Sequence, residues 1–442
     1  MELMEWLSFE QVAYDELIQA REEGREVDGL EAELKTLKNK KGDDHTGKLR
    51  DLYERVIHAK IRTDFPYTEP LSLEEIQKER PRISSPKMKC NFTKEELRDR
   101  IYGAWLGRCA GCLLGKPVEG MSYDQIQSIL KWKHTLPLNF YIAQKGGLPP
   151  ELIMDQEQEK RYRTGTFENV HQMLRDDDID YTMIGLLILE NYGLGFTSFD
   201  VGVTWLQTMP LLMTYTAERV AYRNFANRIN PPASGYTMNP YREWIGAQIR
   251  ADIWGYINPG KPEAAAELAF RDAVLSHSKN GVYGELFFAA AIATAFAVND
   301  IPSVIQGGLS VIPAHSRLFE AVQRVMEWSE VDTDWQVTLK RIFEHYGNYN
   351  WFHTIPNAAI IIMALLHGGG DFERTITIAV SSGLDTDCNG ATAGSIIGAF
   401  LGASRLPSKW IEPLQDHVST AVVGMSDSSI HQLAERTVAF VR

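Results

Sequence analysis

Hydrophobic residues recur at helical spacing through most of this chain. Beyond residue 93 the pattern predicts helices over Tyr181–Glu190, Pro262–Ser276, Glu285–Val298, Ser316–Glu330, Asn357–His367 and Asn389–Leu401. No sustained alternation of apolar and polar residues and no hairpin turn signal competes with these helices. The sequence therefore predicts an all-α main domain.

The first 62 residues carry helical patterns of their own. Apolar positions repeat at helical spacing from Leu3 to Ile18, glycines then interrupt the pattern, and a second apolar stripe runs from Leu49 to Ile57. This segment is predicted to form a helical hairpin or small bundle. Prolines break up residues 64–86, which we interpret as a linker with one short helix from Ser72.

A capping box of Thr93 and Glu96 starts the next helix and marks a domain boundary. We therefore divide the chain into an N-terminal helical element with a Pro-rich linker, residues 1–90, and a main domain, residues 91–442. In the last long helix, four glycines fall on one face, at positions 390, 394, 398 and 402. Each costs a helix interior up to ~1 kcal/mol relative to Ala, so another helix is expected to approach that face closely.

Composition and charge limit the classes of partner. The 442 residues carry a net charge of −13, which disfavours a polyanionic partner such as nucleic acid. The longest apolar stretch, Ala358–Leu366, is far shorter than the ~20 residues of a membrane span. The acidic N-terminus does not resemble a signal peptide, and four cysteines fit a reducing compartment. We expect a cytoplasmic protein without a nucleic-acid or membrane partner.

Two acidic clusters carry the candidate chemistry, Asp176-Asp177-Asp178-Ile179-Asp180 and Asp385-Thr386-Asp387. Two unit charges 4 Å apart repel by ~4 kcal/mol at an effective dielectric of 20. If the clusters converge they therefore need a cation, and carboxylate oxygens suit Mg²⁺ or a similar hard ion. The alternative is that each cluster is a solvated loop rich in helix-capping residues.

Helix geometry favours a site at helix starts. Residues two apart point in nearly opposite directions within a helix, so Asp385 and Asp387 could not share an ion from its middle. Gly383 before them and Asn389-Gly390 after them indicate a loop that enters a helix, where the macrodipole favours carboxylates. Asp177 and Asp178 also precede a helical pattern. Two facing helix N-termini are thus expected to form the cation site.

Other polar residues lie in segments that could border a cleft. His277 precedes a loop signal, His353 precedes a buried helix, and an aromatic and polar segment runs from Tyr236 to Trp244. Its rings could stack on a base or sugar. For each residue the alternative is ordinary core or surface packing. A Cys109–Cys112 pair lacks the second pair that a zinc site needs, and its surroundings resemble a packed helix.

Several motifs occur in a fixed order along the chain. They are Gly103-Ala104-Trp105-Leu106-Gly107, Gly115-Lys116-Pro117-Val118-Glu119-Gly120, the Asp176–Asp178 run, Ser276-His277 with Gly284-Glu285, and Gly383-Leu384-Asp385-Thr386-Asp387 with Asn389. Together they resemble the ADP-ribosylglycohydrolase family over roughly residues 97 to 405. The resemblance implies a multi-helix orthogonal bundle with a binuclear Mg²⁺ centre that binds ribose hydroxyls beside the scissile bond.

The resemblance also implies roles for individual residues. The metal ligands would be Asp176, Asp177, Asp178, Asp385 and Asp387. The candidate catalytic groups are Glu119, Asp178 and Asp180. The segments that could border a cleft, rather than the resemblance, supply the candidate substrate contacts His277, Tyr236, Asn239, Arg242 and His353, to which Asn389 of the last motif is added.

The chain departs from the family pattern at four positions. Asp176 stands where the family has a threonine ligand, and Ile179 and Cys388 replace residues that are usually threonine or serine. Cys112 replaces the aspartate of the usual Gly-Asp pair. A neutral thiol is a poor ligand for a hard ion. The centre is therefore expected to hold one ion tightly and a second weakly, or to prefer Mn²⁺ or Ca²⁺.

These observations predict a metal-dependent hydrolase of a ribosyl-type glycosidic bond, acting on a small-molecule or ADP-ribosylated substrate. The alternatives are a glycosidase of a small ribosylated or glycosylated metabolite and a non-catalytic relative that binds ADP-ribose or a nucleotide. The N-terminal helices are expected to cover the cleft, to restrict its access, or to join copies of the chain in a homo-oligomer.

Overall fold

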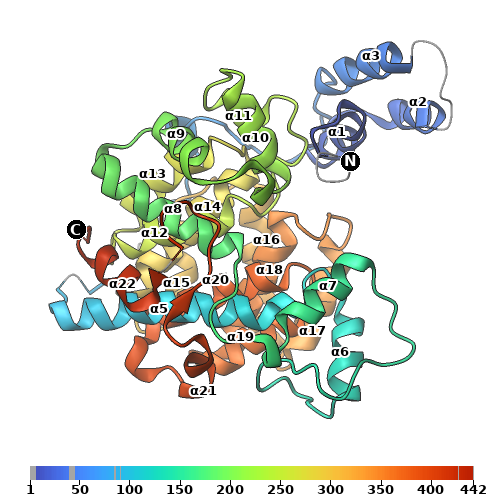
Figure 1. Ribbon diagram of the computed structural model, residues 1–442. Coiled ribbons are helices and arrows are strands. Elements are labelled where there is room, and N and C mark those ends of the chain that lie inside the picture. The colour runs from blue at the N-terminus through green and yellow to red at the C-terminus, as the bar shows by residue number, and fades with distance from the viewer. Residues whose placement is uncertain (1–5, 39–44, 84–85, 90, 427, 442) are drawn as a thin grey trace.

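The computed structural model describes residues 6–38, 45–83, 86–89, 91–426 and 428–441, and most of them are helical (Figure 1). This confirms the predicted all-α class. The helices are α1 Phe9–Glu22, α2 Asp28–Lys38, α3 His45–Ile57, α4 Leu73–Lys78, α5 Lys94–Gly115, α6 Tyr123–Trp132, α7 Gln156–Gly165, α8 Asp177–Tyr192, α9 Ser198–Thr208, α10 Thr216–Ala226, α11 Ala233–Tyr236, α12 Asp252–Tyr256, α13 Pro262–Ala273, α14 Asn280–Ala295, α15 Ile301–Leu309, α16 Arg317–Val331, α17 Trp335–Tyr346, α18 Thr354–Gly368, α19 Phe372–Ser381, α20 Thr386–Leu401, α21 Ser408–Ile411 and α22 Ile430–Val438. Within the described ranges, the only strands are β1 His417–Val418 and β2 Ser428–Ser429, which pair antiparallel.

All six helices that the main-domain pattern predicted are present. Four begin earlier than the hydrophobic pattern indicated: α8 at Asp177, α14 at Asn280, α18 at Thr354 and α20 at Thr386. Each of these helices begins at a polar residue, because the free N–H groups of a helix start are satisfied by polar groups rather than by core contacts. The capping box of Thr93 and Glu96 starts α5, and Ser72 caps the short helix α4.

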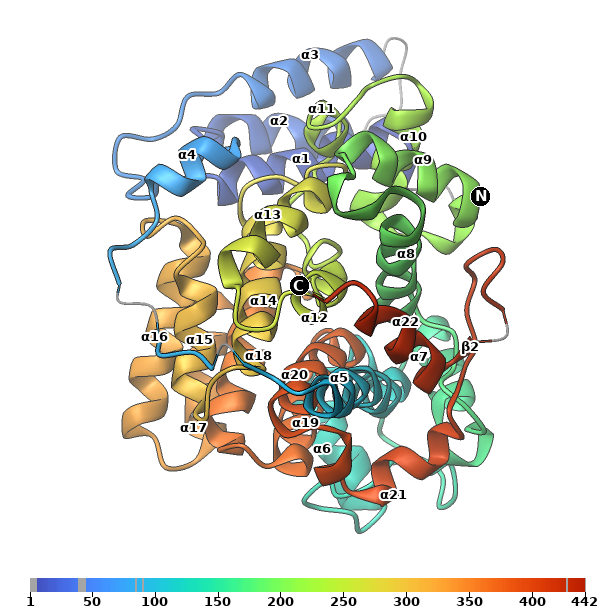
Figure 2. The same cartoon turned by 90° about the vertical axis from the view of Figure 1, so that its left-hand side faces the viewer.

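Helices α1, α2 and α3 form the expected N-terminal helical element. Their apolar faces make a separate hydrophobic cluster that includes Val12, Leu17, Leu52 and Val56. Figure 2 shows them along one edge of the main body. In contrast, Ile76 of α4 belongs to the core of the main domain. The domain boundary near residue 90 stays a prediction, and Gly42-Asp43-Asp44 and Cys90 lie outside the described residues.

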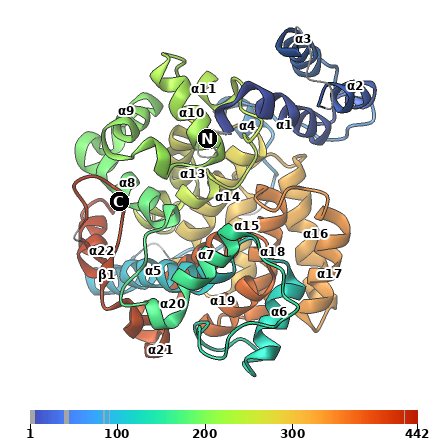
Figure 3. The ribbon, with the colours of Figure 1, turned by 45° about the vertical axis from the view of Figure 1, so that its right-hand side comes forward.

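Helices α5 and α20 run antiparallel at the centre of the main domain, side by side in Figures 2 and 3. A Cβ atom added to Gly394 would collide with the carbonyl oxygen of Gly107, and one added to Gly111 would collide with that of Gly390. The predicted close approach is therefore confirmed. It aligns the end of α5 with the start of α20.

No helix in the described parts of the chain is both long and apolar enough to cross a lipid bilayer.

Candidate metal centre

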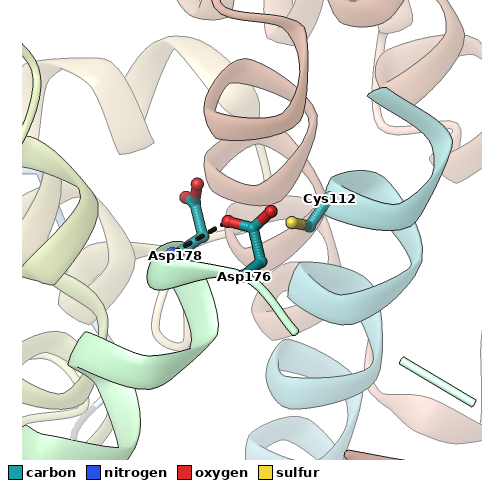
Figure 4. Close-up of side chains that lie close together, drawn as sticks. All are labelled: Cys112, Asp176 and Asp178. Carbon is teal, nitrogen blue, oxygen red and sulfur yellow. Dashed lines mark hydrogen bonds between the residues drawn. The ribbon is translucent and has the colours of Figure 1, made fainter. Parts of the chain in front are cut away.

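The two acidic clusters converge where the C-terminal end of α5 meets the N-terminal ends of α8 and α20. Ligand atoms of Cys112, Asp176 and Asp178 all lie within 4.8 Å of one another, as do those of Asp178, Asp387 and Cys388. Figure 4 shows the first group, with Cys112 on α5 and both carboxylates at the start of α8. Asp178 belongs to both groups, so residues about two hundred positions apart share one buried site.

Backbone contacts hold the end of α5 against the start of α20. The Thr386 hydroxyl donates to the Gly115 carbonyl at 2.8 Å. The Gly120 N–H donates to the Leu384 carbonyl at 2.9 Å, and the Leu384 N–H donates to the Met121 carbonyl at 3.1 Å. The loop before α20 therefore pairs with the segment that contains Glu119.

Arg108, in the middle of α5, fixes the start of α8. Its fully buried guanidinium donates to the Asp178 carbonyl at 2.7 Å and to Asp178 Oδ1 at 3.1 Å. It also pairs with Asp252 at 2.6 Å. Sequence reasoning missed this residue, although an arginine within the apolar run around Cys109 was a signal that a buried carboxylate faces it.

Lys116, the residue after α5, binds Asp176. Its ammonium donates to Asp176 Oδ2, and the Asp178 N–H donates to Asp176 Oδ1 at 3.1 Å. Burial opposes the charged form of Lys116, but Asp176 and Asp387 outweigh it and hold the pKa of Lys116 well above its usual value. Both oxygens of Asp176 are thus engaged by the protein. Sequence analysis did not identify this lysine.

At this site, two carboxylate oxygens have no hydrogen-bond partner among the described residues. Asp178 Oδ2 and Asp387 Oδ1 are buried and accept no hydrogen bond from any described residue. Burial and neighbouring carboxylates raise the pKa of Asp178 and of Asp387 well above the usual range. Unpaired buried oxygens are costly, and hard divalent cations prefer such ligands. These two side chains therefore fit a cation such as Mg²⁺.

The two cysteines at the site fit a hard cation poorly. Burial raises the pKa of Cys112 and of Cys388 well above the usual value, and the surrounding carboxylates raise both further. The thiols stay neutral near pH 7, and neutral thiols bind hard ions weakly.

The other predicted metal ligands border this core. Asp177 is half-buried at the first position of α8, and Asp385 occupies the N-cap of α20. Neither belongs to the two close groups of ligand atoms. Burial raises the pKa of both carboxyls. Their role as ligands stays a prediction.

Asp180 and Glu119, two of the predicted catalytic groups, have different surroundings. Asp180 is fully buried, pairs with Arg175 at 2.8 Å and accepts from the Ala421 N–H at 3.1 Å, so its contacts hold the C-terminal segment on α8. Glu119 is half-buried and lies 3.5 Å from Arg161. Burial raises the pKa of Glu119 to about 7. Glu119 is thus the better placed of the two to exchange a proton near neutral pH.

Asn389 lies at the site and is held by α18. Its amide donates to Asn357 Oδ1 at 2.8 Å, and the same oxygen accepts from the Asp385 N–H at 3.3 Å. Asn389 Oδ1 is buried without a partner among the described residues. This oxygen is free to contact a ligand, and its role stays a prediction.

The remaining predicted substrate contacts face the N-terminal helices. Arg242 donates to Glu16 of α1 at 2.9 Å and to Glu23, directly after α1, at 2.8 Å. His353 Nε2 lies 3.8 Å from Glu22 Oε2. Tyr236 is exposed and lines a cavity of about 510 Å³ between α1, α3 and the main domain.

His277 and Asn239 are buried nearby. Asn239 donates to the carbonyls of Gly235 and Ser276, each at 2.9 Å, and His277 Nδ1 lies 2.7 Å from the Ser276 hydroxyl. No hydrogen bond between the described residues joins these side chains, or those of Arg242, His353 and Tyr236, to the acidic clusters. Their substrate roles stay predictions.

Comparison with known proteins identifies the family of this chain. A search of curated proteins finds ADP-ribosylhydrolase ARH3 of Bos taurus, 24% identical over 151 residues, which covers 32% of this chain and 39% of that relative. A solved structure described as an ADP-ribosylglycohydrolase-related protein complex has a TM-score of 0.48 and 19% identity, and covers 78% of this chain and 98% of its own. The family model described as ADP-ribosylglycohydrolase matches residues 93–441. The chain therefore belongs to the ADP-ribosylglycohydrolase family.

Proposed function

We propose that this protein is a hydrolase that uses a divalent cation to cleave a ribosyl-type glycosidic bond. One observation carries the proposal. Asp178 Oδ2 and Asp387 Oδ1 come from different helices, meet in one buried site, and lack a partner among the described residues. Family membership supports the glycohydrolase class of the reaction.

The site's own groups suit this reaction. Asp178 and Asp387 would hold the cation, which when bound would supply a Lewis acid that orients sugar hydroxyls. Breaking the bond develops positive charge on the ring, which the carboxyl groups of Asp177 and Asp385 would stabilise electrostatically in their ionised forms. Glu119 accepts a proton from water, since its pKa of about 7 leaves much of it ionised near neutral pH.

A second candidate, a glycosidase of a small ribosylated or glycosylated metabolite, is supported by the N-terminal element. The centroids of the Trp6 and Tyr215 rings lie 6.1 Å apart, and the Tyr215 hydroxyl accepts a hydrogen bond from Arg175 at 3.1 Å. Arg175 directly precedes the acidic run of α8. Trp6, just before α1, therefore lies near one side of the site, where it would exclude a bulky protein substrate.

The test compares substrates and cations directly. Hydrolysis of ADP-ribosylated arginine and serine peptides and of small ribosides is measured with Mg²⁺, Mn²⁺ or Ca²⁺ and with chelator. We expect turnover only with a cation. Asp178→Asn and Asp387→Asn should lose turnover, whereas the control Asp51→Asn, whose side chain is exposed, should keep wild-type turnover.

The outcomes separate the candidates. Activity on small ribosides alone favours the second candidate. Full activity in chelator refutes the proposal. If no substrate turns over while ADP-ribose still raises the melting temperature, the protein is a binding relative instead.

A further inference from the structure

The buried acidic cluster offers two adjacent cation positions. One is bordered by Cys112, Asp176 and Asp178, and the other by Asp178, Asp387 and Cys388. All five side chains are buried. Because Asp178 is common to both groups, the geometry is that of a site for two neighbouring positive charges.

The protein itself supplies a positive charge at the first position. The Lys116 ammonium donates to Asp176 Oδ2, and the Asp178 N–H donates to Asp176 Oδ1. Asp178 Oδ1 accepts from Arg108 at 3.1 Å. Apart from Asp178, which both positions share, the first position therefore offers a second ion only the neutral thiol of Cys112.

The second position differs in this respect. Asp387 Oδ1 and Asp178 Oδ2 are both buried and have no hydrogen-bond partner among the described residues. Among the described residues, no lysine or arginine lies within ion-pair distance of the Asp387 carboxylate. This position keeps its carboxylate oxygens available to an external cation.

We propose that the Lys116 ammonium replaces one of two cations at this centre, so that the chain binds a single divalent ion through Asp178 and Asp387. The inference rests on the proposed function only in requiring that the cluster binds a cation. It assigns Lys116 as a positioning residue, because an ammonium supplies charge and N–H donors but no Lewis acidity.

Backbone contacts restrict where Lys116 can go. Lys116 follows Gly115, whose carbonyl accepts from the Thr386 hydroxyl, and a Cβ atom on Gly115 would collide with the Thr386 carbonyl. The Lys116 side chain is only 18% exposed. A divalent ion at the first position would have to displace this ammonium from Asp176 or lie beside it, and like charges in a buried site repel strongly.

The experiment counts ions without substrate or turnover. Full-length protein is titrated with Mn²⁺, bound metal is quantified by equilibrium dialysis and mass spectrometry, and electron paramagnetic resonance detects coupling between neighbouring ions. The panel is the wild type, Lys116→Met, Lys116→Arg, and Lys131→Met as an exposed control lysine. Thermal unfolding checks that each variant is folded.

The expected result is one uncoupled Mn²⁺ per chain in the wild type, Lys116→Arg and Lys131→Met. Lys116→Met should bind a second ion, doubling the stoichiometry and giving a spin-coupled spectrum. Two ions per chain in the wild type would overturn the inference, and this result does not depend on any variant folding. A folded Lys116→Met variant that still binds one ion would also overturn it.

The inference and the proposed function can fail separately. A wild type that binds one Mn²⁺ but hydrolyses no glycoside refutes the enzymatic proposal and leaves the role of Lys116 intact. A wild type that hydrolyses a glycoside but binds two Mn²⁺ ions supports the enzymatic proposal and refutes the proposed role of Lys116.

Discussion

Gly394→Ala is expected to destabilise the protein, although the same change stabilises an ordinary helix. Gly394 lies inside α20, where it faces Gly107 of α5. A Cβ atom there would sit 2.1 Å from the Gly107 carbonyl oxygen, whereas nonbonded atoms prefer ~3.5–4.0 Å. The obstacle is backbone, so no side-chain rotation relieves the collision, and the two helices must separate.

The expected magnitude follows from two opposing terms. Overpacking a close-packed interior typically costs ~1–3 kcal/mol. Replacing Gly by Ala within a helix contributes up to ~1 kcal/mol in the other direction. The net change should be a loss of ~1–2 kcal/mol in the free energy of unfolding.

Chemical denaturation of the two variants and the wild type provides the assay. The matched control is Gly29→Ala in α2, because nothing lies within 4 Å of a Cβ atom at that position. The control should be neutral or slightly stabilised. Gly394→Ala should also bind Mn²⁺ more weakly, since separation of α5 and α20 moves Asp387 away from Asp178. If Gly394→Ala proves as stable as Gly29→Ala, the close approach of the two helices is not what positions the site.

Three further predictions concern single side chains. Activity should rise as the pH passes about 7, where Glu119 loses its proton, and Glu119→Gln should remove this rise and lower kcat by roughly 10²–10⁴. A variant with wild-type activity and pH profile would contradict a catalytic role. Burial raises the pKa of Glu22 from 4.5 to about 8, so the folded state holds its proton more tightly than the unfolded state, and stability falls as the pH rises through that window. Glu22→Gln should therefore have a higher melting temperature than the wild type above pH ~9 but not below pH ~4. The corresponding gain in the free energy of unfolding is at most ~5 kcal/mol. If the variant and the wild type melt at the same temperature at both pH values, this reasoning is refuted. Arg108→Met should cost ~3–5 kcal/mol in urea unfolding, because Asp178 and Asp252 lose their shared buried cation, and a loss below ~1 kcal/mol would contradict that role.

Sequence patterns predicted the helices well because helical periodicity is a local property. The glycine spacing of α20 also predicted correctly that another helix approaches closely. It did not predict that this helix is α5, because a local pattern does not identify which distant helix packs against it. The acidic run located the start of α8 correctly, whereas the start of α14 was missed because Asn280 and Gly281 favour a loop by residue type.

The acidic residues of the candidate site were found from their helix-start positions, whereas the cations that pair with them were not. Arg108 lies on α5 and Lys116 directly follows this helix, seventy and sixty residues before Asp178 and Asp176. Nothing local to these residues indicates which carboxylate each would meet. Likewise, the contacts of Arg242 with Glu16 and Glu23 join segments more than two hundred residues apart, so a role in docking α1 could not be read from its own loop.

By itself, the amino-acid sequence determined that this protein is helical, that it belongs with proteins bearing the same ordered motifs, and that its carboxylates gather at helix starts. These properties follow from periodicity, capping and residue type, which act over a few positions. Only the tertiary structure decided which oxygens stay free. Asp176 is neutralised by Lys116 while Asp178 and Asp387 keep an unpaired oxygen, because pairing depends on how separate helices pack and not on the order of their residues.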